Sequence, residues 1–293
     1  MTRRTNQYFL FVFLYFLLCS ELLAPWMARF LPFSSIWVNI LFQFIVFLPL
    51  IGIYLKTERV PFRECLALRP IHWKNALLSI GITYCALPFV SMIVILTSPL
   101  QPNLAEESMQ ALSSSGSFPA LLLFIAVQPA IFEECLFRGV ALHGYRSLGR
   151  WRALLVSAFL FGMLHMNLQQ ALYAFALGAL FAFLVQRTGS ILASMLPHFF
   201  INAINCAASY FAPPQMGIVA EPSWLQQMFF SGLQCLIFLP FLAGLLFWFV
   251  RRNPLPSESL PVSCRQEKII TLSLIFIILI FILFGVLPNL YAF

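Results

Sequence analysis

Two adjacent glutamates, Glu133 and Glu134, stand in a stretch that is otherwise almost wholly apolar, and Arg138 follows them. Residues four apart on a helix lie on nearly the same face, so Glu134 and Arg138 are expected to pair. Glu133 then points about 100° away from Glu134, where it is free to face an interior cavity. Such a carboxylate can act as the general base that deprotonates a water molecule, with Glu134 as the structural partner of Arg138.

Two further motifs add imidazole and carboxamide groups. Phe161 and His165 are four residues apart, and so are His198 and Asn202. A histidine can orient the attacking water or pass its proton to the leaving amine. His198 and Asn202 share one helical face, and together they offer two donors for a tetrahedral oxyanion, each worth roughly 3–4 kcal/mol. With the two glutamates, these residues fit amide hydrolysis.

The sequence excludes two other mechanisms of intramembrane proteolysis. It contains no aspartate, which rules out a mechanism based on two aspartates. It also contains no H-E-x-x-H, the motif that places two zinc-binding histidines one helical turn apart.

The elements that position these motifs must cross a membrane. The chain of 293 residues is 61% hydrophobic and only 9% charged, whereas soluble domains carry about 25% charged residues. Each crossing helix needs roughly 20 apolar residues, so the composition predicts an all-α, polytopic membrane helical bundle. The apolar runs give nine candidate spans, with eight as the alternative: Tyr8–Leu23, Ile36–Leu55, Ala76–Leu96, Pro119–Phe137, Trp151–His165, Gln170–Gln186, Ser190–Phe211, Met228–Val250 and Ile269–Leu287.

The basic residues indicate the orientation of these spans. The net charge of +7 could suggest nucleic acid, but 16 of the 17 Lys and Arg residues fall in alternate connecting segments, and only Arg29 lies in the others. This bias predicts a cytoplasmic N-terminus and no nucleic-acid partner. The seven cysteines include no C-x-x-C pair, and they are expected to be packing residues.

The connections are too short for a separate soluble domain, so residues 1–293 are expected to form one membrane-embedded domain. Residues 119–211 would be its catalytic core. Four side chains are expected to converge on a single cavity that opens toward the cytoplasmic half: Glu133, His165, His198 and Asn202. The oligomeric state stays open, because three small residues can pack helices within one chain or between chains: Gly178, Ala179 and Ala182.

The motifs E-E-x-x-x-R, F-x-x-x-H and H-x-x-x-N, in this order on successive membrane helices, resemble the CAAX protease and bacteriocin-processing (CPBP) family of intramembrane endopeptidases. That family includes the type II CAAX prenyl proteases. The likeness covers Pro119–Phe211, including Phe137-Arg138-Gly139, and the flanking helices match only in being hydrophobic. The resemblance implies that Glu133 and His165 activate water and that His198 and Asn202 form the oxyanion site.

Metal dependence stays open at this stage. Members of the family are often labelled metalloproteases, and Glu133, His165 and His198 are side chains of the types that make a three-ligand catalytic zinc site. A carboxylate that works with an asparagine does not require zinc. We therefore expect a site without a metal or other cofactor.

Two other classes of function compete with proteolysis. A non-catalytic immunity or scaffold protein could use the same fold, but it would not need a costly intramembrane glutamate at position 133. A proton-coupled transporter could use buried Glu and His residues, but the sequence shows no duplicated half. The expected partners are the lipid bilayer and a peptide or membrane-protein substrate, which could be prenylated or bear a leader. The expected location is a bacterial inner membrane, with the endoplasmic reticulum as the alternative.

Overall fold

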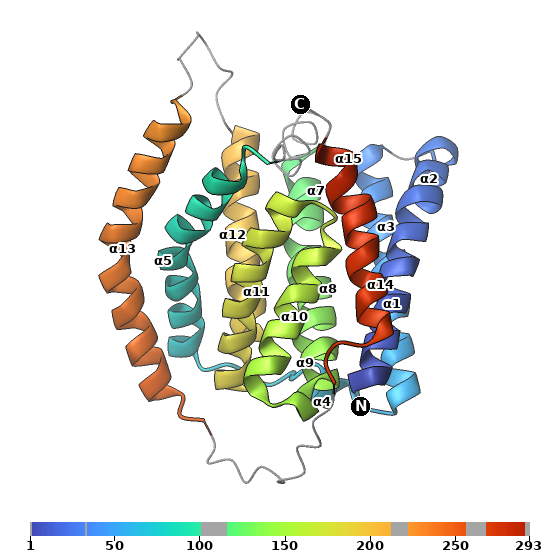
Figure 1. The fold of residues 1–293 in the computed structure, drawn as a ribbon, viewed down its shortest axis with the longest axis horizontal. Helices are drawn as coiled ribbons and strands as arrows, with labels where there is room; N and C mark the ends of the chain where they lie inside the picture. The colour runs from blue at the N-terminus through green and yellow to red at the C-terminus, as the bar shows by residue number, and fades with distance from the viewer. Residues whose placement is uncertain (1, 33, 101–115, 212–221, 256–267, 291–293) are drawn as a thin grey trace.

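A computed structural model describes residues 2–32, 34–100, 116–211, 222–255 and 268–290. Every regular element in these ranges is a helix (Figure 1). Arg265, which contributes to the charge pattern above, lies outside the described residues.

Each of the nine predicted spans coincides with a helix or a run of joined helices. Several of these runs contain π-helical stretches, labelled η. In chain order they are α1 (Thr2–Leu18) with η1 (Cys19–Leu23) and α2 (Ala24–Phe30); α3 (Ser35–Glu58); α5 (Trp73–Thr97); α7 (Phe118–Leu122) with η2 (Leu123–Val127), α8 (Gln128–Glu134), η3 (Cys135–Ala141) and α9 (Leu142–Gly144); α10 (Arg150–Leu164); α11 (Leu168–Thr188); α12 (Leu192–Phe211); α13 (Trp224–Arg252); and α14 (Leu272–Ile280) with η5 (Phe281–Val286) and α15 (Leu287–Leu290). Two short helices, α4 (Phe62–Cys65) and the 3-10 turn η4 (Arg146–Leu148), lie in connections.

Six of these helices are long and apolar enough to cross a membrane, judged by their length and composition among the described residues. They are Thr2–Phe30, Ser35–Glu58, Trp73–Thr97, Phe118–Gly144, Leu168–Thr188 and Trp224–Arg252. α10 is shorter: its 15 residues extend about 22 Å, less than the ~30 Å hydrocarbon layer. The count of nine spans and the cytoplasmic N-terminus stay predictions.

Hydrogen bonds between helix ends and connecting segments bring basic residues together at one end of the bundle, the lower end in Figure 1, where α4 and α9 lie. The guanidinium of Arg252 donates to Asn75 over 2.9 Å, and that of Arg187 donates to the carbonyl of Asn253 over 3.3 Å. Ser190 donates to the carbonyl of Arg69. We call this end of the bundle the basic end.

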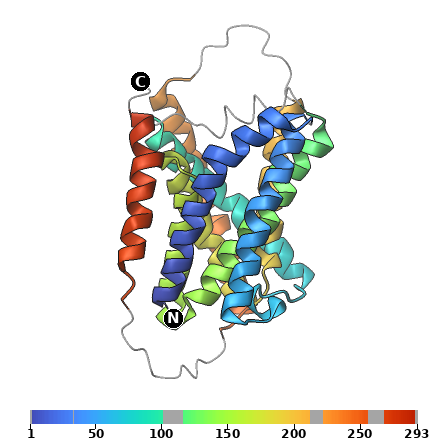
Figure 2. The same cartoon turned by 90° about the vertical axis from the view of Figure 1, so that its right-hand side faces the viewer.

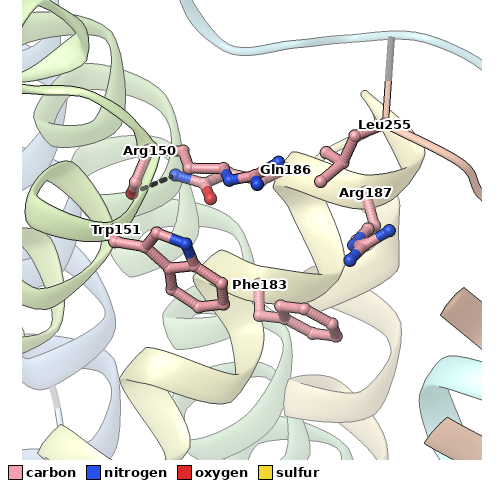
Figure 3. A pocket seen from close by; sticks show the side chains of 6 residues that line it. All are labelled: Arg150, Trp151, Phe183, Gln186, Arg187 and Leu255. Atoms are coloured by element: carbon pink, nitrogen blue, oxygen red, sulfur yellow. Dashed lines mark hydrogen bonds between the residues drawn. The ribbon is translucent and has the colours of Figure 1, made fainter. Parts of the chain in front are cut away.

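A small pocket lies at the basic end between α10 and α11 (Figure 3). Its volume is about 10 Å³, room for one water molecule. The side chain of Gln186 donates to the carbonyl of Arg150 over 3.0 Å across it. The other lining residues are Trp151, Phe183, Arg187 and Leu255. None of these six carries a carboxylate, so the pocket is not a candidate active site.

The first and last helices of the bundle lie side by side, α14 along α1 (Figure 2). A buried network joins them at the basic end. The carboxamide of Asn6 donates to the carbonyl of Ile269 over 2.9 Å and to the hydroxyl of Thr271 over 2.8 Å. It accepts a 2.6 Å hydrogen bond from the hydroxyl of Tyr145. Because Asn6 and Tyr145 are fully buried, these bonds tie both ends of the chain to the motif-bearing segment.

The segments that carry the motifs lie in the middle of the bundle: α8 with η3, α10 and α12 (Figure 1). α13 packs on α5 at the periphery and exposes large apolar side chains such as Leu236 and Phe229. Such a face is suited to contact with lipid. The peripheral helices therefore shield a polar interior from the bilayer.

Candidate active site

The two glutamates end a short α-helical segment, α8, which lies between the π-helical stretches η2 and η3. A π-helical turn holds more residues than an α-helical turn, and such turns are common at functional sites. The phase of the helix therefore changes just before and just after Glu133 and Glu134. This change sets which side of the bundle each carboxylate faces.

Glu134 and Arg138 form the contact that their spacing predicts. A guanidinium nitrogen of Arg138 lies 3.0 Å from the carboxylate oxygen Oε1 of Glu134, and both side chains are fully buried. The Arg138 guanidinium also lies over two aromatic rings, 4.3 Å from the centroid of Phe161 and 5.3 Å from that of Phe181. The rings and the carboxylate together hold a cation that the membrane interior would otherwise exclude.

Gly178 of α11 makes room for this arginine. A Cβ atom at position 178 would lie 3.0 Å from the ring of Phe161 and 3.2 Å from a guanidinium nitrogen of Arg138. The sequence left open whether Gly178 packs within the chain or between chains. Here the residue packs against the Glu134–Arg138 pair.

His198 connects the two glutamates. Its Nδ1 lies 2.8 Å from Oε1 of Glu134, and its Nε2 lies 3.9 Å from Oε2 of Glu133. Glu134 therefore has a second partner besides Arg138, which the helical spacing alone did not predict. With Glu134 accepting from Nδ1–H, the ring is oriented so that Nε2 faces Glu133.

Glu133 lines a cavity of about 500 Å³ together with His165. Its side chain is 21% exposed, whereas that of Glu134 is fully buried, so only Glu133 is accessible from this cavity. His165 faces the interior, where its Nδ1 lies 2.9 Å from the carbonyl of Phe161. The ring of Phe161 contacts both imidazoles, at 5.0 Å from His165 and 6.3 Å from His198 between centroids.

The lining of the cavity bears on the expectation that it opens toward the cytoplasmic half. Besides Glu133, the lining includes Asn39 near the start of α3 and Phe124 near the start of η2. These residues lie in the half of the bundle away from the basic end, which is the predicted cytoplasmic end. The orientation of the bundle in the membrane is itself a prediction, so the side from which the cavity opens stays a prediction as well.

Asn202 caps a backbone carbonyl. Pro129 has no N–H group and cannot bond the carbonyl of Ile125 four residues earlier. The side-chain nitrogen Nδ2 of Asn202 lies 3.0 Å from that carbonyl oxygen and donates to it. Nδ2 carries a second hydrogen, which remains for a bound ligand. Neither Asn202 nor His198 is among the residues that line the cavity.

The structure thus brings Glu133, Glu134, Arg138 and His198 into direct contact and joins His165 to them through Phe161 and the cavity. From the sequence, Glu133, His165 and His198 are the three side chains of types that could bind a catalytic zinc ion. Within the described residues, no group of three His, Cys, Asp or Glu side chains is arranged to hold a metal ion. These three therefore do not fit a preformed three-ligand zinc site.

Sequence reasoning missed Phe181, whose ring lies 5.5 Å from the imidazole of His198, and the uncharged polar lining of the cavity. Phe181 gave no signal, because the chain contains 33 phenylalanines. The carboxamides that line the cavity carry no charge, so a search for ionisable residues passes over them; a search for all polar residues in the spans would have found them.

A glycine within the second motif allows α10 and α11 to approach closely. A Cβ atom at position 162 would lie 2.5 Å from the carbonyl oxygen of Ala171, a contact that backbone atoms can relieve only by moving the helices apart. We expect Gly162→Ala to lower the free energy of unfolding by about 1–3 kcal/mol and to reduce activity, because Phe161 and His165 flank it. Thermal unfolding in detergent measures the first effect.

The matched control for this substitution is Gly52→Ala in α3, where a Cβ atom would have no neighbour within 4 Å. Alanine is about 1 kcal/mol more favourable than glycine in a helix, so Gly52→Ala should leave stability unchanged or raise it slightly. Equal melting temperatures for the two variants would contradict the close approach at Gly162.

Comparison with known protein families gives a match over part of the chain. Residues 115–204 match the family model of the type II CAAX prenyl endopeptidases, Rce1-like. The matched segment contains all three motifs, from Glu133 to Asn202. It confirms, over this segment, the predicted resemblance to the CAAX protease and bacteriocin-processing family. No curated protein and no solved structure matches the chain.

Together with the six apolar helices, the family match supports an integral, multi-pass membrane protein. The matched family model describes an endopeptidase.

Proposed function

We propose that this chain, whose central segment matches the type II CAAX prenyl endopeptidases, hydrolyses peptide bonds of membrane-associated substrates with water activated by Glu133. One observation carries the proposal: Glu133 alone of the two glutamates is accessible from a cavity, and the other three charged or ionisable groups of the cluster are buried behind it. Prenylated peptides, leader peptides and membrane-protein tails are the proposed substrates.

The proposed reaction begins with a water molecule in the cavity between Glu133 and His165. Glu133 takes a proton from the water, and the hydroxide oxygen adds to the substrate carbonyl carbon. The tetrahedral intermediate carries a negative oxygen. Its collapse breaks the carbon–nitrogen bond, while His165 or protonated Glu133 delivers the proton to the leaving amine. The products are a carboxylate and a free amine.

His198 and Asn202 are the proposed donors to the oxyanion. Because Nδ1 of His198 faces Glu134 at 2.8 Å, Nε2 can donate only when the ring carries both protons. Asn202 would contribute the hydrogen of Nδ2 that does not point to Ile125.

We also propose that the chemistry needs no metal. The support is the arrangement described above, in which Glu133, His165 and His198 do not meet as three ligands, while His198 is occupied by Glu134. A bacterial inner membrane is the proposed location, with the endoplasmic reticulum second. The lipid bilayer and the peptide substrate are the proposed partners.

We expect Asn202→Ala to reduce turnover by about 100- to 1000-fold with little change in KM. If Asn202 only supported a zinc ligand, Asn202→Ala would instead reduce turnover by about 10- to 100-fold. The measurement is steady-state cleavage of a quenched fluorescent peptide that ends in a farnesylated cysteine and three further residues, in detergent. A metal chelator should leave wild-type turnover unchanged.

The control for this experiment is Asn205→Ala, one turn along α12, where the asparagine is exposed. It should cleave as the wild type does. Stoichiometric zinc in active protein, lost together with activity on chelation, would defeat the metal-free proposal. An unchanged turnover of Asn202→Ala would remove this residue from the oxyanion site.

A further inference from the structure

Four carboxamide side chains line the cavity next to Glu133. Asn39 and Gln43 come from α3, and Asn167 and Gln170 come from the start of α11. No Lys or Arg lines the cavity, and the rest of the wall is largely apolar: Phe16, Phe42, Phe47, Phe124 and Leu164. A carboxamide carries both donors and an acceptor but no charge. The wall is therefore suited to a neutral polar ligand with apolar substituents.

In two of these carboxamides, one polar atom forms a hydrogen bond and the other has no partner. Nε2 of Gln43 donates to the carbonyl of Phe124 over 3.3 Å, while its Oε1 is buried and has no partner. Oδ1 of Asn167 accepts from the backbone N–H of Gln170 over 2.9 Å, while its Nδ2 is buried and has no partner. An unsatisfied buried group costs about 1–3 kcal/mol, so this wall holds one acceptor and one donor that a ligand would stabilise.

The other two carboxamides are partly exposed, and the side chains of Asn39 and Gln170 form no hydrogen bond within the described residues. Asn39 and Gln43 lie one helical turn apart, which separates their Cβ atoms by about 5–6 Å. In an extended peptide, residues on the same side repeat about every 6.6 Å. The spacing along α3 is therefore close to that of an extended peptide.

We propose that Asn39, Gln43, Asn167 and Gln170 form a subsite for the main chain of the substrate, which they hold in an extended conformation beside Glu133. The proposal rests on the proposed function, in which Glu133 activates water. An extended peptide brings an unpaired N–H and C=O at each residue, which lipid cannot satisfy, whereas a helical segment pairs its own. The subsite therefore selects unwound segments with apolar side chains, without reading a particular sequence.

Replacement of backbone amides tests this subsite. An ester in place of one amide removes a single N–H donor and leaves the side chains unchanged. Binding of the farnesylated peptide, and of versions with each amide in turn replaced by an ester, is measured by fluorescence anisotropy on the Glu133→Gln protein in lipid nanodiscs. We expect one ester to weaken binding by about 3- to 10-fold.

Gln43→Leu, combined with Glu133→Gln, removes the acceptor Oε1. It should weaken binding of the all-amide peptide by the same factor. It should also abolish the loss of binding caused by the ester whose amide N–H donates to Gln43. The matched control is Gln234→Leu, an exposed glutamine of α13, which should keep the full ester penalty. Because Gln43→Leu also leaves the carbonyl of Phe124 unpaired, Asn39→Leu is the second variant. It breaks no hydrogen bond within the described residues, and it should weaken binding of the amide peptide.

An ester penalty that persists in Gln43→Leu, or no penalty at any position, would overturn the subsite and leave a cavity that holds only water. If the ester penalty depends on Gln43 but the wild type does not cleave the peptide, the subsite stands and the proposed function is refuted instead. The two failures are therefore distinguishable.

Discussion

Glu133→Gln should reduce turnover by about 100- to 10,000-fold and leave folding and substrate binding near those of the wild type. Glutamine has nearly the size of glutamate but cannot accept a proton from water. Among the described residues, the side chain of Glu133 forms no hydrogen bond; its Oε2 lies 3.9 Å from Nε2 of His198, and the side chain is partly exposed in the cavity. Little structural stability therefore depends on its charge. Cleavage of the farnesylated fluorescent peptide measures the effect.

Glu21→Gln is the matched control, because Glu21 is an exposed glutamate in η1. It should cleave at the wild-type rate. Comparative proteomics of membrane peptides from cells with wild-type or Glu133→Gln protein would identify natural substrates by their loss. If Glu133→Gln kept the wild-type rate, the base would have to lie elsewhere. If neither protein cleaved any peptide, and cells with the Glu133→Gln protein behaved as cells with the wild type do, the non-catalytic scaffold function would be supported instead.

Glu134→Gln should destabilise the protein, because it leaves Arg138 charged and fully buried without its carboxylate. Removing one partner of a buried ion pair costs about 3–5 kcal/mol, a large part of a typical unfolding free energy of about 5–15 kcal/mol. Chemical unfolding in detergent measures the loss. Turnover should fall as well, even where the variant is folded, because Nδ1 of His198 loses its charged acceptor.

The double variant Glu134→Leu with Arg138→Met separates the two effects. It removes both charges together, and well-packed apolar replacements of a buried pair are often neutral for stability. We expect it to be more stable than Glu134→Gln and still inactive, because His198 is no longer oriented. Wild-type stability of Glu134→Gln would show that the pair with Arg138 contributes little. Full activity of the double variant would show that His198 needs no partner at Glu134.

The sequence predicted the helices well, because apolar runs and the scarcity of charge dictate helices at membrane depth. It also predicted the Glu134–Arg138 contact, since that contact depends only on a spacing of four within one helix. The number of crossings was harder to predict. α10 is helical as expected, but it is too short to span the hydrocarbon layer by itself, and composition alone does not reveal where a buried helix ends.

Contacts between helices were the part of the site that the sequence could not predict. The bond between His198 and Glu134 joins α12 to α8, 64 residues apart, and no periodicity encodes it. The π-helical stretches η2 and η3 also change the phase of the helix around Glu133, so a count at 3.6 residues per turn fails across them. The hydrogen bond from Asn202 to the carbonyl of Ile125 likewise joins two helices, and the oxyanion role of Asn202 stays a prediction.

The hydrogen bonds of Asn6 have a consequence for the order in which the protein is assembled. Its acceptors at Ile269 and Thr271 are 263 and 265 residues further along the chain. At about 5–20 residues per second, a ribosome needs roughly 13 to 53 seconds to synthesise that stretch. Throughout this time the first helix has no native acceptor for its carboxamide. It therefore forms these two hydrogen bonds only after Ile269 and Thr271, which lie just before α14, have been synthesised.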